Sequence, residues 1–224
     1  VDISNISSWM EILNSDTSWS IGAFNQNQNP NVQFDLGWGT YSLITHFITG
    51  DSIHILKLSD GNYKKLILEQ LAGGTYYFKY ADIDGSNEVN DSISKSDFSG
   101  KNFGYYSIQN SQVIDREPMA NSWDLLFTKY VSEVAPGMPY GVTGVLTNAG
   151  LETAKVEGVA VNESNENAYN NSLYSSKINT IGWDWKSMNF STSTYTVDDS
   201  LSYFIKDANG DIWKLVMKEY VGFG

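Results

Sequence analysis

The sequence is organised around a hairpin pattern that occurs twice. The first copy reads Gly50-Asp-Ser-Ile-His-Ile-Leu-Lys-Leu-Ser-Asp-Gly-Asn-Tyr-Lys-Lys-Leu66, and the second reads Asp198-Asp-Ser-Leu-Ser-Tyr-Phe-Ile-Lys-Asp-Ala-Asn-Gly-Asp-Ile-Trp-Lys-Leu215. In each copy, strand-forming residues flank a turn dipeptide, Asp60-Gly61 or Asn209-Gly210. These dipeptides favour hairpin turns, because such turns need positive φ. The repeat therefore predicts two β-hairpins of one design.

Strand-like segments continue on both sides of the two hairpins. They are rich in aromatic or β-branched residues and are bounded by Gly, Asp or Asn, and no convincing amphipathic helix of ordinary length interrupts them. We therefore expect an all-β fold built from antiparallel hairpins, with little helix. The strand candidates are Trp19–Phe24, Val32–Leu36, Thr40–Ile48, Ile53–Leu58, Tyr63–Leu71, Thr75–Ala81, Phe103–Ile108, Ser122–Tyr130, Tyr140–Leu146, Trp183–Phe190, Tyr195–Val197, Tyr203–Lys206 and Ile212–Tyr220.

A polar stretch divides the chain into two predicted units. Residues Asp82–Gly100 are rich in Asp, Ser, Asn and Gly and carry few apolar residues, which favours a linker or a long surface loop. We place the two units at residues 1–98 and 99–224. We expect about Gly37–Gly74 to superpose on about Gly182–Gly224 as the same hairpin-containing sheet, with Gly182-Trp183 standing where Gly37-Trp38 stands.

Composition excludes several classes of partner. The 224 residues are 41% hydrophobic and 14% aromatic, which is ample for a folded β-rich protein. The net charge of -12 disfavours nucleic acid and anionic membranes as partners, because phosphate neutralisation needs clustered Lys and Arg. Cysteine is absent, so disulfides and thiolate zinc sites are excluded. The sequence has no run of about 18 apolar residues, so we expect no transmembrane segment.

Motifs in the second half resemble a known family. The motifs are Ser122-Trp-Asp-Leu-Leu-Phe-Thr-Lys-Tyr130, the flanking Tyr105-Tyr-Ser-Ile108 and Gly141-Val-Thr-Gly-Val-Leu146, and the final Tyr203-Phe-Ile-Lys206 with Gly210-Asp-Ile-Trp-Lys-Leu215. Together they resemble the HmuY-like domains of haem-binding lipoproteins and hemophores from Bacteroidota, over about Asn102–Gly224. Residues Val1–Asp82 resemble only the latter portion of that domain. The chain is therefore similar to tandem HmuY-like repeats.

This resemblance implies an all-β fold, export to the cell surface or medium, and haem held by two axial side chains. Family members are understood to use histidine or methionine pairs, and His46 and His54 are the two histidines of this chain. A two-residue turn at Gly50-Asp51 would put them on opposite faces of the sheet, whereas a three-residue loop would set them directly opposite each other. The alternative to haem ligation is a strand histidine capped by a hydroxyl or carbonyl group.

Two other ligand classes have weaker patterns. Asp82, Asp84 and Glu88 place carboxylates on alternate residues and are candidate calcium ligands, but the spacing of a complete calcium loop is lacking, and a plain turn is favoured. Seven tryptophans would suit a glycan-stacking platform if several were exposed on one face. Core packing is favoured for those on strand patterns. They are Trp123, Trp183, Trp185 and Trp213.

The sequence contains no recognisable catalytic motif, so we expect no enzyme. The favoured function is an exported, non-catalytic surface or secreted protein that acts as a structural, adhesive or ligand-binding module. Haem binding and glycan binding are the alternatives.

The repeat is also incomplete at both ends. The first copy continues into the strand-like Tyr76-Tyr-Phe-Lys-Tyr80, whereas the second copy stops soon after Leu215, and the chain begins at Val1 without a methionine or a signal peptide. We therefore expect a removed leader or a longer tandem array. The Ile212–Tyr220 strand should present an unpaired edge, which a missing segment or a strand from another chain would cover.

Overall fold

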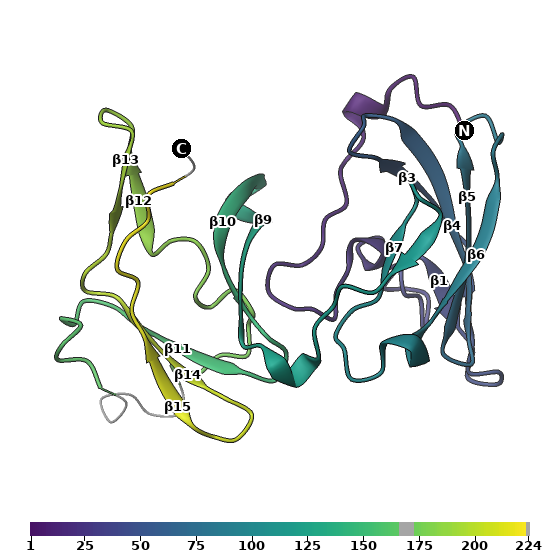
Figure 1. Ribbon diagram of the computed structural model, residues 1–224. Helices are drawn as coiled ribbons and strands as arrows, with labels where there is room; N and C mark the ends of the chain where they lie inside the picture. Colours follow the sequence, from purple (N-terminus) through teal and green to yellow (C-terminus); the bar gives the residue numbers. More distant parts are fainter. Residues whose placement is uncertain (166–172, 223–224) are drawn as a thin grey trace. The chain divides into compact units, whose positions relative to one another are not determined.

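The computed structural model describes residues 1–165 and 173–222. The described chain contains strands and four short 3₁₀ segments, Ile6–Ser8 (η1), Ala23–Asn25 (η2), Lys95–Phe98 (η3) and Ala120–Ser122 (η4), and no α-helix (Figure 1). The paired strands are all antiparallel. The prediction of an all-β fold with little helix is therefore confirmed.

The chain forms two compact units, and they differ from the predicted division. The first unit contains Val1–Asn14 and Ile21–Ala120, and the second contains Ser15–Ser20 and Asn121–Gly224. The division lies after residue 120 rather than after residue 98, because the hairpin of β7 (Tyr105–Ser107) and β8 (Gln112–Ile114) packs within the first unit.

The first unit is built mainly on a six-stranded sheet. Its strands are β1 (Gly39–Tyr41), β2 (Ile48–Gly50), β3 (Ile53–Lys57), β4 (Tyr63–Ala72), β5 (Thr75–Asp82) and β6 (Val89–Ser94). The order is β1-β2-β4-β5-β6, and β3 also pairs with β4.

The connection between β2 and β3 is not a hairpin turn. Both strands pair with β4, where Ile48 lies opposite Leu71 and His54 lies opposite Leu66. β2 and β3 therefore pair with the same edge of β4, one after the other, and the segment after Gly50 separates the two paired regions. Both turn geometries expected around Gly50-Asp51 are wrong.

One face of this sheet packs against distant parts of the chain. Leu66, Phe78 and Tyr80 form a buried cluster on β4 and β5. Phe24 from the N-terminal segment and Tyr106 from β7 pack against this cluster. The inner face of the sheet is thus covered by loops and a short hairpin.

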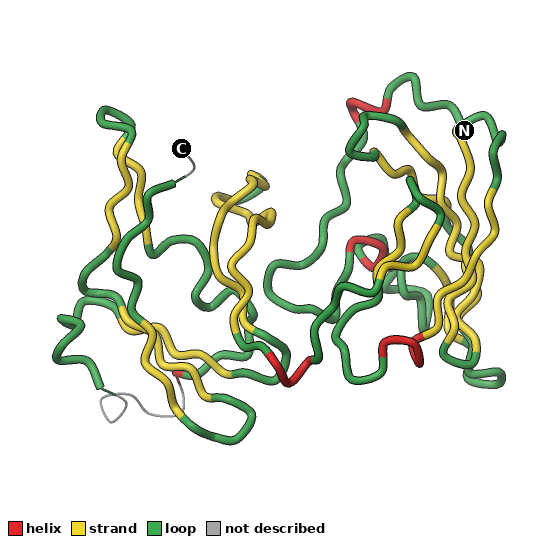
Figure 2. The backbone as a smooth tube through the Cα atoms, in the orientation of Figure 1, coloured by secondary structure: helices red, strands yellow, loops and turns green. Residues whose placement is uncertain are grey.

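The described residues of the second unit form three separate sheets (Figure 2). The strands are β9 (Leu125–Ala135) paired with β10 (Met138–Thr147), β12 (Lys186–Asn189) paired with β13 (Thr194–Val197), and the order β11 (Glu152–Val156), β14 (Ser202–Lys206), β15 (Ile212–Leu215). Its main core gathers residues from β10, β14 and the segment before β12. They include Val145, Ile181, Trp185, Tyr203 and Ile205.

The repeated hairpin has the same turn in both units. In β3–β4 the Leu58 amide donates to Asn62 O at 2.8 Å, and in β14–β15 the Asp207 amide donates to Asp211 O at 2.9 Å. The turn glycines have φ of 87° for Gly61 and 89° for Gly210. The two predicted hairpins therefore form with one design.

The sheets around the two hairpins differ, so the prediction of one common sheet is wrong. In the first unit β2 pairs with β4, whereas in the described part of the second unit β13 pairs only with β12. The contacts of the tryptophans also differ in position, because the amide of Asp51 donates to Trp38 O at 3.2 Å, whereas the amide of Asp198 donates to Trp185 O, and not to Trp183 O, at 3.1 Å. Phe223 and Gly224, at the end of the compared segment, lie outside the described residues.

Strand β15 lies at the edge of its sheet. Within residues 1–165 and 173–222 it pairs only with β14, whereas its counterpart β4 lies between β3 and β5. Trp213 on this strand is 63% exposed, so its predicted role in the core is wrong. An unpaired edge at this position agrees with the expectation from the repeat.

Candidate functional site

A large cavity lies against the inner face of the first unit's sheet. Its volume is about 1080 Å³. We call it the His54 cavity. It is lined from the strands by residues that include His54, Leu66, Phe78 and Ile93, and from the N-terminal segment by Ile12 and Phe24.

The wall of this cavity is mainly apolar. Alternate residues of β4 and β5 reach it, namely Leu66 and Leu68 and Tyr76 and Phe78, because residues two apart on a strand point to the same face. On β3 all of the residues Ile53–Lys57 line it. Its volume is slightly above the range of about 300–1,000 Å³ that is typical of small-molecule sites, which are usually apolar with a few polar groups that orient the ligand. The cavity therefore has the chemistry of a site for an apolar ligand.

His54 is the polar side chain that stands out in this wall. Only 6% of its surface is exposed, and its ring centroid lies 4.5 Å from that of Phe24. Its Nδ1 is buried and has no hydrogen-bond partner in the described residues. Burial lowers the pKa of His54 below its ordinary value, because the charged imidazolium is poorly solvated there.

His46 lies elsewhere, so the predicted histidine pair is not brought together. It sits in the β1–β2 connection with φ of 59°, is exposed, and its Nδ1 is hydrogen bonded to the Tyr41 hydroxyl at 2.7 Å. Ile48, two residues beyond His46, pairs five β4 residues away from the partner of His54, which is roughly 16 Å along a strand. That separation is far greater than two axial ligands on one iron allow.

The residues present do not fit a bis-histidine haem site. One of the two predicted ligands, His54, lines the cavity, and the other does not. A metal-bound histidine also ordinarily donates its second ring N–H to a carboxylate, carbonyl or water. The buried Nδ1 of His54 has no such acceptor within the described chain.

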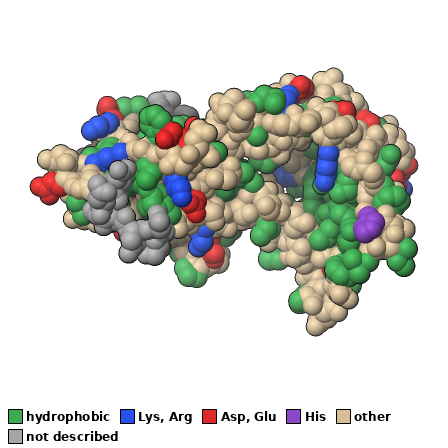
Figure 3. Space-filling model, turned by 90° about the horizontal axis from the view of Figure 1, so that it is seen from below, with side chains coloured by type: hydrophobic (Ala, Val, Ile, Leu, Met, Phe, Trp, Pro, Cys, Tyr) green, Lys and Arg blue, Asp and Glu red, His purple; other side chains and the backbone are tan. Residues whose placement is uncertain are grey.

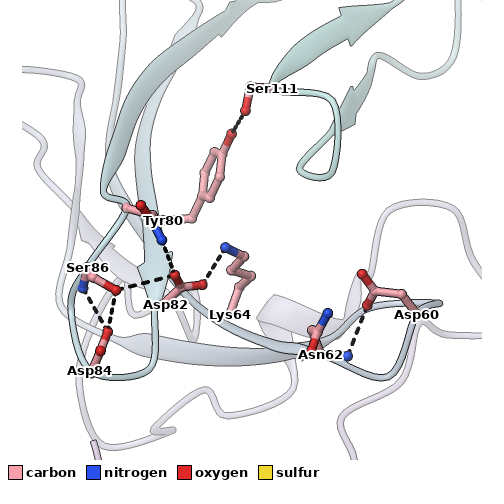
Figure 4. Close-up of polar contacts among 9 residues, drawn as sticks. Asp60, Asn62, Lys64, Tyr80, Asp82, Asp84, Ser86 and Ser111 are labelled. Atoms are coloured by element: carbon pink, nitrogen blue, oxygen red, sulfur yellow. Dashed lines mark hydrogen bonds and ion pairs between the residues drawn. The ribbon is translucent and has the colours of Figure 1, made fainter.

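Two of the predicted calcium ligands, Asp82 and Asp84, are held by other protein groups, and the third, Glu88, accepts a hydrogen bond from Asn90 Nδ2 at 3.4 Å. The carboxylate of Asp82 accepts hydrogen bonds from Lys64 at 2.5 Å and from Asn87 at 2.6 Å, and Asp84 accepts one from the Ser86 hydroxyl at 2.7 Å (Figure 4). These contacts lower the pKa of Asp82, first through the Lys64 side chain. The described residues contain no group of three or more His, Asp or Glu side chains suited to a metal ion. The arrangement is a satisfied polar turn.

A second, polar pocket of about 570 Å³ lies beside this turn. It is lined by residues that include Asp60, Lys64, Tyr80 and Ser111. The Tyr80 hydroxyl donates to Ser111 Oγ at 2.7 Å, as Figure 4 shows. Because these polar groups already satisfy one another, this pocket points to a ligand less clearly than the His54 cavity does.

The tryptophans do not assemble into a stacking platform. Among the described residues, Trp9 in the first unit is 45% exposed and Trp213 in the second is 63% exposed, while Trp38 and Trp185 are buried. One well-exposed tryptophan per unit does not make the several-residue face that the glycan alternative requires.

Sequence reasoning identified His54 but missed the rest of its surroundings. Phe24 comes from a segment that the sequence shows only as the end of a possible strand, and Tyr106 comes from beyond the predicted linker. Alternation along β4 and β5 indicates which residues face inward. The alternation does not indicate that these side chains leave a cavity beneath the sheet.

No helix of the described chain is long and apolar enough to cross a membrane. Comparison of this chain with protein-family models, with curated proteins and with solved structures found no match.

Proposed function

We propose that this protein is a non-catalytic ligand-binding module whose first unit holds an apolar small molecule in the His54 cavity. The observation that supports this most directly is a mainly apolar volume of about 1080 Å³ with the ring of the buried His54 in its wall. Small-molecule sites typically combine an apolar wall with a few polar groups, which favours a ligand here. On the sequence resemblance alone, we also propose export to the cell surface or medium.

The proposal is tested with N-phenyl-1-naphthylamine, an uncharged apolar probe that fluoresces when it leaves water. We expect saturable binding to the whole chain. Leu68→Trp fills part of the cavity wall and should weaken binding at least about tenfold. Ile44→Trp, on a side chain that is 92% exposed, is the matched control and should bind as the native protein does. Unsaturable binding, or binding unaffected by Leu68→Trp, would remove the proposal.

Haem is the second candidate ligand, because one of the two histidines implied by the family resemblance lies on the cavity. Titration with haemin distinguishes this candidate from other apolar ligands. A Soret band that shifts with His54→Ala but not with His46→Ala would support haem binding at this cavity. A spectrum that neither substitution changes would exclude both histidines as haem ligands.

A further inference from the structure

The backbone of β15 carries hydrogen-bonding groups that point away from β14. Next to the turn of this hairpin the Asp207 amide donates to Asp211 O at 2.9 Å, so these two residues form a hydrogen-bonded pair. Such pairs alternate with non-hydrogen-bonded ones along an antiparallel ladder, so the next residue of β15 that bonds to β14 is Trp213. The N–H and C=O groups of Ile212 and Lys214 therefore face outward, and we call them the β15 edge.

The other side of β14 gives the same assignment. Thr153 of β11 exchanges two hydrogen bonds with Ser175, each of 2.9 Å, so its backbone groups point away from β14. Ile205, which lies opposite Thr153, therefore directs its own groups toward β15, where it pairs with Trp213. Both observations leave Ile212 and the residue two beyond it facing outward.

In the matching hairpin of the first unit, the same edge is paired. Lys65 of β4 is the counterpart of Lys214, and it lies opposite Ala81 of β5 in an antiparallel ladder. Within residues 1–165 and 173–222, β15 pairs only with β14 (Figure 1). The hairpin design therefore accepts an antiparallel strand at this edge, and the described part of the second unit does not supply one.

The usual protection of an edge strand by a free lysine charge is reduced here. The ammonium group of Lys214 donates to Val161 O and, at 2.6 Å, to Ser164 O, so it is directed toward its own chain. Trp213, on the opposite face of β15, is 63% exposed, and its Nε1 donates to Asp207 at 3.0 Å. The β15 edge thus carries a fixed, exposed aromatic side chain beside its open backbone groups.

We propose that β15 pairs antiparallel with β15 of a second copy of this chain, about a twofold axis at Trp213. In this register Ile212 of each copy exchanges two hydrogen bonds with Lys214 of the other, so the whole β15 edge is used. The two Trp213 residues lie opposite each other in the closer, non-hydrogen-bonded pair, where aromatic pairs stabilise a sheet. An axis at Lys214 would instead place like charges opposite each other.

A second copy fits this edge because one short segment supplies both halves of the pairing. The interface is isologous, so it closes as a dimer and does not propagate into a fibre. It lies on the second unit and does not depend on the ligand of the His54 cavity.

Sedimentation velocity of the native chain at rising concentration tests the dimer. We expect a reversible monomer–dimer equilibrium with a Kd of about 10 µM to 1 mM, because the paired strands are short. Ile212→Pro removes an outward N–H at the first residue of the strand, where proline is tolerated, and should weaken dimerisation at least about tenfold. Ile212→Ala keeps the N–H and should weaken it less than about threefold.

Three results of this experiment would overturn the proposal. They are a native chain that stays monomeric at about 1 mM, species that keep growing beyond the dimer, and a dimer that Ile212→Pro weakens no more than Ile212→Ala does.

Disulfide trapping tests the register, because the chain has no cysteine of its own. Trp213→Cys places the two cysteines across the twofold axis with Cα atoms about 4.5 Å apart, a separation that a disulfide spans. The controls are Lys214→Cys, which lies off the axis, and Phe190→Cys, on an 86% exposed side chain outside β15. We expect Trp213→Cys to form a covalent dimer at least about tenfold faster than either control. A rate at Trp213→Cys that does not exceed both control rates would overturn the proposed pairing.

Discussion

At the scale of single residues, Gly50 is the position where the backbone leaves least room. A Cβ added at Gly50 would lie 1.6 Å from Leu68 O, so the backbone of β2 or β4 would have to move. We expect Gly50→Ala to reduce the free energy of unfolding of the first unit by about 3 kcal/mol or more, because overpacking at a backbone contact is relieved only by distortion. Urea unfolding followed through NMR signals of the first unit measures this effect.

The control for Gly50→Ala is Gly141→Ala on β10, where a Cβ meets no heavy atom within 4 Å. That change should alter stability by less than about 1 kcal/mol. Equal effects of the two substitutions would show that the close approach of β2 to β4 is not maintained in solution.

At the scale of elements, the repeated hairpin predicts equal sensitivity of its two turns. Gly61 and Gly210 have left-handed φ, and a Cβ at either position meets nothing within 4 Å. Alanine should therefore cost about 1–2 kcal/mol at each position through backbone strain alone. Asparagine, which tolerates this conformation better, should cost less. Unfolding measurements on the four single variants test this, and an alanine effect confined to one hairpin would contradict the common design.

Strand β15 predicts a different pattern of amide exchange from β4. Because β15 pairs on one side within the described chain, alternate amides along Ile212–Leu215 should exchange rapidly with solvent in dilute protein. The amides of β4 between β3 and β5 should be protected throughout. We expect protection of β15 to rise with protein concentration, because an unpaired edge is a template for another strand. Exchange at β15 that is already slow in dilute solution would contradict the free edge.

At the scale of the whole molecule, a short N-terminal segment belongs to the C-terminal unit. Asp16 accepts hydrogen bonds from Ser132 Oγ at 2.6 Å and Asn179 Nδ2 at 3.1 Å, and Trp19 Nε1 donates to Thr147 O at 2.9 Å. The second unit is therefore not a continuous stretch of sequence. A fragment that begins at Asn121 would lose these partners.

Asp16→Ala tests this arrangement in the complete chain. It leaves Ser132, which is only 6% exposed, without its acceptor and should destabilise the second unit by about 1–3 kcal/mol. The first unit should unfold as before. Asp2→Ala is the control, because Asp2 accepts from the Ser4 amide two residues away. If Asp16→Ala affects the first unit alone, the assignment of Ser15–Ser20 to the second unit is wrong.

Hydrophobic side chains also gather on the exterior of the first unit, at the right of Figure 3. The exposed hydrophobic residues of the first unit include Leu43 and Ile44 of the β1–β2 connection, which are 60% and 92% exposed. Single exposed apolar residues are ordinary on a protein surface. The His54 cavity differs from this surface in having a buried histidine in its wall.

The sequence by itself determined the all-β class and the two hairpin turns, because alternation and Gly-containing turns act over a few neighbouring residues. It also selected His54 as a candidate, through residue type and resemblance. Only the tertiary structure decided that β2 and β3 share β4, that His46 lies far from His54, and that Asp16 belongs to the second unit. The physical reason is that sheet order, and the cavity left beneath a sheet, depend on packing between segments remote in sequence, and local patterns do not encode that packing.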